Sequence, residues 1–295
     1  MSKLSSITHV GWVDLPVAEA SALATKMVNG RREVIVLGDR TWQIGVSSYT
    51  DAGFGEWRTI EMPTDADWPV HNNDSQFEAI AVDGGNLAAV MREDPPVVLV
   101  AEVGTRRLRA QITLTAPKGS PLYDTWGDPT SRGEGMVMLR DGRLLVAKEK
   151  RPAALIEFCP VGSSAQGLAR DDFLDDGEAW DAPEGDVDFV AAAVWRLKGS
   201  AKRKLRDISD IAVGPDKTLW MLSDKSAAIA PLCLDKPLPA SGGTIRSVDQ
   251  VWRLPDGTTK PEGLTALGDR RILIAMDTDT TERNGMIVEF PAPRR

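Results

Sequence analysis

Cysteine, histidine and tyrosine are scarce in this chain of 295 residues, which has two of each. Cys159 and Cys233 lie in apolar runs without the spacing of a zinc site or a disulfide framework, so we interpret both as small buried hydrophobic residues. The two histidines are His9, expected beside the closing strand, and His71, a lone loop histidine that we interpret as incidental rather than catalytic. The sequence also has no Gly-x-Ser-x-Gly elbow, phosphate-binding loop or dinucleotide fingerprint, which disfavours the hydrolases and nucleotide-binding proteins that depend on them.

An excess of positive charge and long apolar runs are also missing. The net charge of −8 argues against a nucleic-acid partner, which would require a basic face. No apolar run approaches the ~18–20 residues that span a membrane. The first residues, MSKLSSITHVGWVDLP, lack the apolar core of a signal peptide, so we expect a cytoplasmic protein with no membrane partner.

What the chain does contain is a repeated β-hairpin pattern. Each copy reads as an apolar strand, a turn of Gly, Asp or Asn, and a second strand rich in Val, Ile and Leu. The five copies are ASALATKMVNGRREVIVLGDR (20–40), FEAIAVDGGNLAAVMRED (77–94), GEGMVMLRDGRLLVAKEK (133–150), ISDIAVGPDKTLWMLSDK (208–225) and PEGLTALGDRRILIAMDT (261–278).

Two further strands complete each copy. Third strands follow the hairpins in WQIGVSS, VVLVAEV, ALIEFC, AIAPLCL and GMIVEF. The fourth strands are VGWVDLP (10–16), EWRTIEMP (56–63), LRAQITL (108–114), AAVWRLKG (192–199) and QVWRLPDG (250–257). Four of these fourth strands carry a tryptophan at the same position, which indicates packing of one sheet on the next. They are Trp12, Trp57, Trp195 and Trp252.

This pattern predicts an all-β, five-bladed β-propeller of four-stranded blades, formed by residues 1–295 as a single domain. Because the chain begins with a fourth-type strand and ends with a third-type strand, the N-terminal strand should complete the last blade and close the ring. The insertion at about 160–188 is acidic, and we expect it to be a solvated loop. The alternative is a six-bladed ring in which this insertion hides a degenerate blade.

Acidic side chains recur at one end of the predicted channel. The first strands begin at Ser21, Glu78, Glu134, Ser209 and Glu262, with Asp210 after Ser209, and the second strands end at Asp39, Glu93, Glu149, Asp224 and Asp277. One hypothesis is structural, with these acids accepting backbone hydrogen bonds or pairing with nearby cations. A second is a metal site of Glu78, Glu134, Asp210, Glu262 and Asp277, since Ca²⁺ or another divalent cation takes oxygen ligands. A third is acid–base catalysis by paired carboxylates.

Other side chains could hold a substrate at this end. Arg92, Lys148 and Lys150 are candidates for binding an anion. Trp68 and Trp126, in the long connections before Glu78 and Glu134, are candidates for an aromatic platform or, equally, for anchors that hold these long loops. The last repeat differs from the others in its longer MDTDTTERNG connection, which carries Asp277, Asp279 and Glu282 and could chelate a cation or be a simple loop.

The segments EGMVMLRDGRLLVAKEKRPAALIEF, DISDIAVGPDKTLWMLSDKSAAIAPL and KPEGLTALGDRRILIAMD resemble the SdiA-regulated, phytase-esterase-like group of propellers. Glu134-Gly135 with Lys148-Glu149-Lys150 matches one hairpin motif of that group, and Ser209-Asp210 with Ser223-Asp224 matches another, with Asp210 in place of the usual Gly. A looser similarity links the repeats to calcium-dependent lactonase propellers, and implies a central metal held by Glu78, Glu134, Asp210 and Glu262. No Asn stands at these positions, unlike the lactonase pattern.

These observations favour a propeller that binds a cation or a small polar ligand at the acidic end of its channel. The more specific hypothesis is a metal-dependent ester or phosphoester hydrolase, with Glu134 or Glu149 as general base. The alternative is a non-catalytic propeller that binds a protein or a metabolite on the same face.

Overall fold

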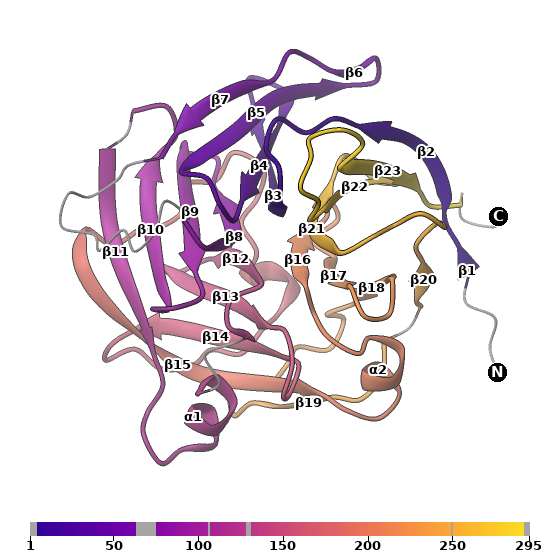
Figure 1. The fold of residues 1–295 in the computed structure, drawn as a ribbon. Helices are drawn as coiled ribbons and strands as arrows, with labels where there is room; N and C mark the ends of the chain where they lie inside the picture. Colours follow the sequence, from indigo (N-terminus) through magenta and orange to yellow (C-terminus); the bar gives the residue numbers. More distant parts are fainter. Residues whose placement is uncertain (1–4, 63–74, 106, 128–130, 249, 292–295) are drawn as a thin grey trace.

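The computed structural model describes residues 5–62, 75–105, 107–127, 131–248 and 250–291. Its β-strands form twisted, mostly antiparallel sheets that radiate from a central axis, which is the arrangement of a propeller (Figure 1). The predicted all-β propeller is therefore confirmed at the level of fold class. Among the described residues, no helix is long and apolar enough to cross a membrane.

The first sheet follows the predicted hairpin and its third strand. Its elements are β3 (Ala20–Val28), β4 (Arg31–Gly38), β5 (Gln43–Thr50), β6 (Gly53–Phe54) and β7 (Arg58–Glu61). The turn between β3 and β4 is Asn29-Gly30, and both residues have positive φ angles, 50° and 75°. Such a turn matches the right-handed twist of the two strands, which explains the tight hairpin.

The next two repeats merge into one nine-stranded sheet. The first contributes β8 (Phe77–Val82), β9 (Leu87–Arg92), β10 (Val97–Glu102) and β11 (Arg107–Thr115). The second contributes β12 (Gly135–Leu139), β13 (Arg143–Lys148), β14 (Ala154–Pro160) and β15 (Gly185–Leu197). They are joined because the outer strands β11 and β15 pair in parallel, from Ala110 opposite Gly185 to Thr115 opposite Val190. The short β19 (Gly243–Ile245) adds to β15 on the same sheet.

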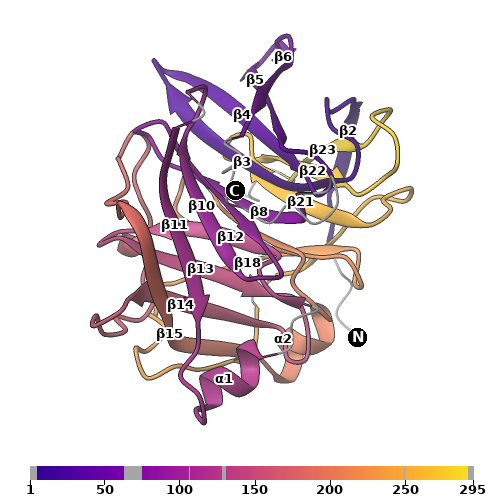
Figure 2. The same cartoon turned by 60° about the vertical axis from the view of Figure 1, so that its left-hand side comes forward.

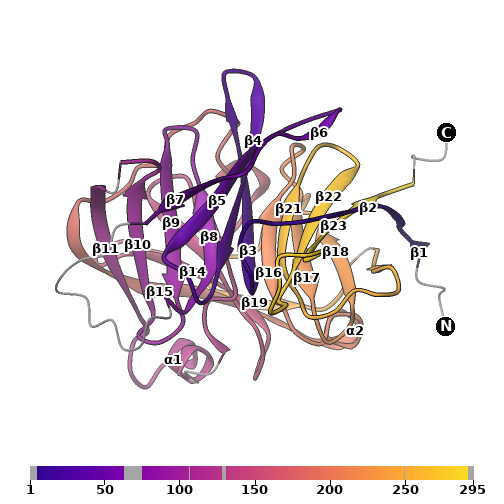
Figure 3. The same cartoon turned by 45° about the horizontal axis from the view of Figure 1, so that its top comes forward.

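The last two repeats each take up a strand from the N-terminal segment. One sheet contains β16 (Asp210–Val213), β17 (Leu219–Ser223), β18 (Ala228–Leu232), β20 (Trp252–Arg253) and β1 (Ser5–Ser6). The other contains β21 (Pro261–Ala266), β22 (Arg271–Met276), β23 (Gly285–Glu289) and β2 (Thr8–Val13). The predicted closure is confirmed, since β2 pairs antiparallel with β23 (Figure 3).

Helices are few and short among the described residues. They are α1 (Pro121–Trp126), α2 (Gly199–Lys204) and a 3₁₀ turn at Arg170–Asp172. Helix α1 begins after Ser120, whose hydroxyl accepts a hydrogen bond from the Tyr123 amide, and it lies against the outer strand β15 (Figure 2).

The core lies between neighbouring sheets, where the recurring tryptophans pack. Trp195 is fully buried, and its indole nitrogen donates to the Pro239 carbonyl over 3.1 Å. Trp252 is 9% exposed, and its ring centroid lies 4.8 Å from that of Phe290. Trp12 and Trp57 are half-buried against the sheets on either side. The expected packing role of this tryptophan series is thus seen in the contacts.

The acidic insertion is largely exposed, as predicted, but a few of its residues are anchored to the body of the protein. Arg143, 1% exposed, donates to Glu157 over 2.7 Å and to Asp172 of the insertion over 2.6 Å. The backbone amide of Trp180 donates to Asp83 over 2.9 Å, and the Trp180 ring is buried. A buried arginine must be paired, so these contacts tie the insertion to the body of the protein. The anchoring contacts could not be predicted, because the sequence does not reveal which cation Asp172 meets.

The two cysteines also differ from each other. Cys159 is buried in β14, as expected, but Cys233 is exposed. The prediction for Cys233 was wrong because Cys233 follows the end of β18, where alternation of the chain no longer directs it to the core.

Candidate functional site

The first strands of the five repeats surround the central axis. Contacts link β3 to β8, β8 to β12, β12 to β16, β16 to β21 and β21 back to β3. Two serines join neighbouring strands at the end where these strands begin. Ser21 donates to the Phe77 carbonyl over 2.7 Å, and Ser209 donates to the Pro261 carbonyl over 2.9 Å. These bonds hold the residues that precede Glu78 and Glu262, so both glutamates start from fixed backbone positions.

Three glutamates lie at this end of the channel, which we call the acidic mouth. They are Glu78, Glu134 and Glu262, at or just before the starts of β8, β12 and β21. Burial, followed by repulsion from neighbouring carboxylates, raises the pKa of Glu78 and Glu134 well above the usual value. Burial and Asp277 raise the pKa of Glu262 to about 7, although Lys260 opposes the rise. Since Glu134 interacts with both Glu78 and Glu262, the three carboxyls share one electrostatic environment.

A second set of carboxylates surrounds them where the second strands end. Its members are Asp39, Glu93, Glu149, Asp224 and Asp277. Burial is the main cause that raises the pKa of Glu93 and of Asp224. Every repeat has an acid at this position. Glu78 is repelled by Asp39, Glu93 and Asp277, so the carboxyls of the two sets lie close enough to influence one another.

Cations lie on the rim of the acidic mouth. Lys225 contacts Glu149 over 3.0 Å, and Lys150 pairs with the same carboxylate. Lys260 pairs with Asp277. These lysines neutralise part of the outer set, whereas the inner glutamates Glu78 and Glu134 have no cation among the causes of their pKa shifts. The net charge that remains at the centre of the mouth is therefore negative when these groups ionise.

Two acids that the sequence did not single out belong to this region. Glu19 is 7% exposed and pairs with Arg40 over 2.6 Å, and burial followed by a hydrogen bond with Asp39 raises its pKa to about 7. Asp207 is fully buried and accepts hydrogen bonds from Ser223 and from the Lys225 amide. Both residues lie in the connection just before a first strand. An acid at that position is the feature from which the sequence could have predicted them.

Asp210 does not face the acidic mouth as the metal hypothesis expected. Its carboxylate accepts the amide of Ile211 over 2.7 Å and the amide of Leu264 over 2.6 Å. Burial raises the pKa of Asp210 well above the usual value, against the lowering effect of these two bonds. Both oxygens are occupied by the backbone of β16 and β21, so Asp210 joins two inner strands. We therefore do not count Asp210 among the candidate metal ligands.

The predicted substrate-binding residues are also placed differently. Arg92 is 3% exposed and donates to Gln76 over 3.0 Å. Lys148 is fully buried and donates to Ser131 and to the Lys150 carbonyl. Both cations are buried and already donate to neighbouring groups of the protein, so they do not present a free surface to an anion as predicted. Lys150, by contrast, lies at the rim.

Of the two candidate platform tryptophans, the structure describes Trp126, which is buried and does not form an exposed platform. Trp126 is 3% exposed and packs edge-on against Phe158, with ring centroids 4.9 Å apart. This burial agrees with the alternative role of an anchor for the long connection, and α1, which ends at Trp126, contacts β15. Trp68 lies outside the described residues, and so does His71.

The chemistry of the acidic mouth fits a hard cation, since the donors are carboxylate oxygens with too few cations around them. Its geometry does not form a complete coordination shell. Among the described residues, no three His, Cys, Asp or Glu side chains are grouped closely enough to hold one metal ion. The inner glutamates would therefore have to move together to become ligands of the same ion.

No protein-family model matches the chain, and no curated protein matches it. Solved structures do resemble it. Regucalcin from Agrobacterium tumefaciens, described as a calcium-binding protein, aligns over 95% of this chain and 93% of its own, with 10% identity and a TM-score of 0.51. Virginiamycin B lyase from Staphylococcus aureus aligns over 97% and 89%, with 12% identity and a TM-score of 0.46. At such identities the likeness concerns the fold, and the regucalcin match supports the propeller architecture.

Proposed function

We propose that the acidic mouth binds a divalent cation, with Ca²⁺ as the first candidate. The observation that carries this proposal is the group of three glutamates at the centre of the mouth, whose pKa values all rise through burial and repulsion from neighbouring carboxylates. Carboxyls in such a position cost free energy when they ionise together, and a cation removes that cost. The description of the regucalcin structure as calcium-binding agrees with this choice of ion.

The proposed ring has five blades, built on β3, β8, β12, β16 and β21. The cyclic contacts of these five strands support that number, as does the pairing of β2 with β23 that completes the last sheet. In this arrangement Glu78 and Glu134 stand on adjacent blades, and Glu262 stands across the axis between the blades of Ser209 and Ser21. A cation on the axis is then the species that all three can approach.

Cation binding should release protons, and this provides the direct test. Burial raises the pKa of Glu262 to about 7, so this carboxyl is partly protonated at pH 7, and burial and repulsion raise the pKa of Glu78 and Glu134 in the same direction. A bound cation requires the ionised form, so each binding event displaces protons into the buffer. Calorimetric titration of chelator-treated protein with Ca²⁺ in two buffers of different ionisation enthalpy measures this number.

We expect a net release of protons on Ca²⁺ binding at pH 7, and a smaller release at pH 9. Glu134→Gln should weaken binding at least tenfold and lower the proton count. The exposed Glu56→Gln is the matched control and should behave as the parent protein. No binding heat with Ca²⁺, Mg²⁺ or Mn²⁺, or equal binding by parent and Glu134→Gln, would overturn the proposal.

The proposed reaction is hydrolysis of an ester or phosphoester with an anionic group. A bound cation would supply polarisation of the scissile group and an acidified water. The chain itself would supply Glu134 or Glu149 to hold a proton, and the rim lysines Lys150, Lys225 and Lys260 to orient the anion. The rim lysines replace Arg92 and Lys148 in this role, because those two are buried.

A panel of carboxylic and phosphoric esters tests the reaction separately from the cation. Activity that requires Ca²⁺ and falls at least a hundredfold in Glu134→Gln supports the assignment. Cation binding without activity on any ester favours the alternative, a non-catalytic propeller that holds a metabolite or a protein at the acidic mouth.

A further inference from the structure

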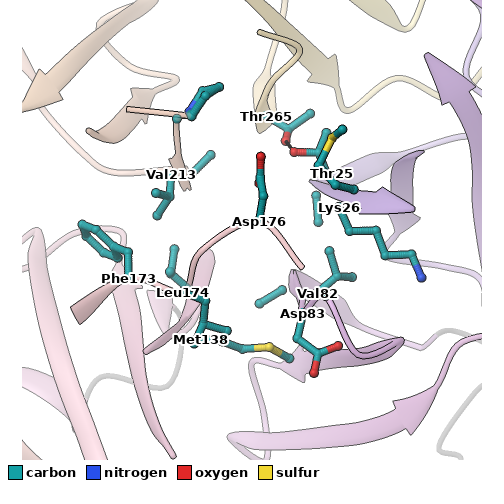
Figure 4. A pocket seen from close by; sticks show the side chains of 18 of the residues that line it. Thr25, Lys26, Val82, Asp83, Met138, Phe173, Leu174, Asp176, Val213 and Thr265 are labelled. Atoms are coloured by element: carbon teal, nitrogen blue, oxygen red, sulfur yellow. Dashed lines mark hydrogen bonds between the residues drawn. The ribbon is translucent and has the colours of Figure 1, made fainter. Parts of the chain in front are cut away.

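A cavity lies in the central channel at the end opposite the acidic mouth. Its volume is about 440 Å³, within the range of small-molecule binding sites. The lining residues come from the last halves of the inner strands, and Figure 4 shows Thr25, Val82, Met138, Val213 and Thr265 around it. We call it the lower cavity.

The insertion covers this end of the channel. Phe173 bridges to Leu139, and its carbonyl accepts a hydrogen bond from Lys217 over 3.3 Å. Asp175 pairs with Lys217 over 2.6 Å, and Arg140 holds Glu178 over 2.7 Å. The segment 173–177 is thus fixed from both sides, and its side chains become part of the cavity wall.

The wall of the lower cavity combines an apolar surface, on which the body of a ligand can pack, with hydrogen-bond acceptors. Ile80, Val82, Met136 and Met138 supply aliphatic surface on two neighbouring strands. Methionine adapts its shape to different ligands, since three of its bonds rotate.

Thr265 donates to the Thr25 hydroxyl over 3.2 Å, and Thr25 donates to the Ala266 carbonyl over 3.4 Å. Each threonine hydrogen is already used, so the lone pairs that remain favour a ligand that donates.

The cationic side chains that line the lower cavity are engaged by other groups of the protein, whereas Asp176 is left for a ligand. Lys26 bonds Asn86 over 2.7 Å, Arg32 bonds the Ala266 carbonyl over 2.8 Å, and Lys217 pairs with Asp175. Asp176 makes no hydrogen bond or ion pair with any residue that the structure describes. In Figure 4 its side chain extends across the middle of the cavity, toward the side on which Thr25 and Thr265 lie.

We propose that the lower cavity binds a small amphipathic amine. Its aliphatic or aromatic body would pack on Val82, Met136 and Met138, and its ammonium group would meet the Asp176 carboxylate and the Thr265 hydroxyl. This site is separate from the acidic mouth and does not depend on the function proposed there.

Three probes with the same chain and different head groups test the proposal by calorimetry: octylamine, 1-octanol and octanoate. We expect octylamine to bind most tightly and octanoate at least tenfold more weakly. Asp176→Asn should weaken octylamine binding by about threefold to fivefold, because the carboxylate is exposed and screened, and leave 1-octanol unchanged. Asp171→Asn, on the same insertion but outside the cavity lining, is the control and should have no effect.

Two further variants separate the lower cavity from other sites. Val213→Phe fills the lower cavity and should abolish binding of all three probes, with thermal unfolding to verify the fold. Glu262→Gln alters the acidic mouth and should leave octylamine binding intact. The proposal is overturned if octanoate binds as well as octylamine, if Val213→Phe binds as the parent does, or if Glu262→Gln rather than Asp176→Asn weakens octylamine.

Discussion

The pKa of Glu262 leads to a specific expectation for stability. A carboxyl whose pKa is raised in the folded protein leaves folding unaffected while it is protonated in both states, and destabilises the folded state once it ionises. For Glu262 the pKa rises from 4.5 to about 7, so the loss of stability develops between those two values as the pH increases. The raised pKa values of Glu78 and Glu134 act in the same direction.

The size of the effect follows from the same shift. One pKa unit corresponds to about 1.4 kcal/mol, so ionised Glu262 costs about 3 kcal/mol as an upper bound. Because the side chain is partly exposed, solvent screening reduces this to about 1–2 kcal/mol. Glu262→Gln removes the charge and keeps the shape. It should therefore match the parent protein near pH 4.5 and exceed its free energy of unfolding by about 1–2 kcal/mol at pH 8.

Urea unfolding in chelator at the two pH values, followed by tryptophan fluorescence, measures this difference. Glu56→Gln is the control, since that side chain is exposed and lies between β6 and β7, in the outer part of its sheet. If Glu262→Gln were less stable than the parent at pH 8, the ionic attraction of Lys260 would outweigh burial and repulsion, and the reasoning would be refuted. Adding Ca²⁺ at pH 8 should stabilise the parent more than the variant, because the ion binds only the folded state.

Three substitutions test the other structural assignments. Asp210→Ala should lower the free energy of unfolding by about 2–4 kcal/mol, since the amides of Ile211 and Leu264 lose their buried acceptor. Thermal unfolding should detect this loss, whereas the Ca²⁺ affinity at 25 °C should change less than threefold. Arg143→Met should expose the insertion to limited proteolysis, because Glu157 and Asp172 lose their common partner; cleavage no faster than in the parent would contradict that anchoring role. Trp195→Ala should cost about 3–5 kcal/mol in urea unfolding, whereas a loss under 1 kcal/mol would show that neighbouring side chains refill its place.

Most of the fold could be predicted from the repeat pattern. Each hairpin is local, and the alternation of apolar residues fixes which face of a strand is buried, so β8 with β9 and β21 with β22 could be located from the sequence. The order of strand types along the chain, which starts with a fourth strand and ends with a third, also predicted the pairing of β2 with β23. The parallel pair β11–β15 could not be anticipated, because it joins two repeats through a register that no local pattern encodes.

The candidate site was predicted in outline only. An acid at the same position of every repeat marked the acidic mouth, and the shared environment of Glu78, Glu134 and Glu262 agrees with that prediction. Asp210 was misassigned because one residue along a strand reverses the direction of a side chain, and it follows Ser209, the aligned position. Lys148 was misassigned because the sequence does not reveal the buried acceptor Ser131. The lower cavity had no sequence signal, since its wall combines ordinary strand residues with a distant insertion.

The parallel contact between β11 and β15 makes two of the repeats mechanically one body. In a ring of independent sheets, each outer strand ends in free backbone groups, and each sheet can open by itself. Here the outer strands β11 and β15 are hydrogen-bonded to each other, so strain that loosens β11 must also pull on β15 and, through it, on β19. The backbone amides of the outer strands β11 and β15 should consequently exchange slowly, whereas the amides of the outer strands of the remaining sheets should exchange sooner.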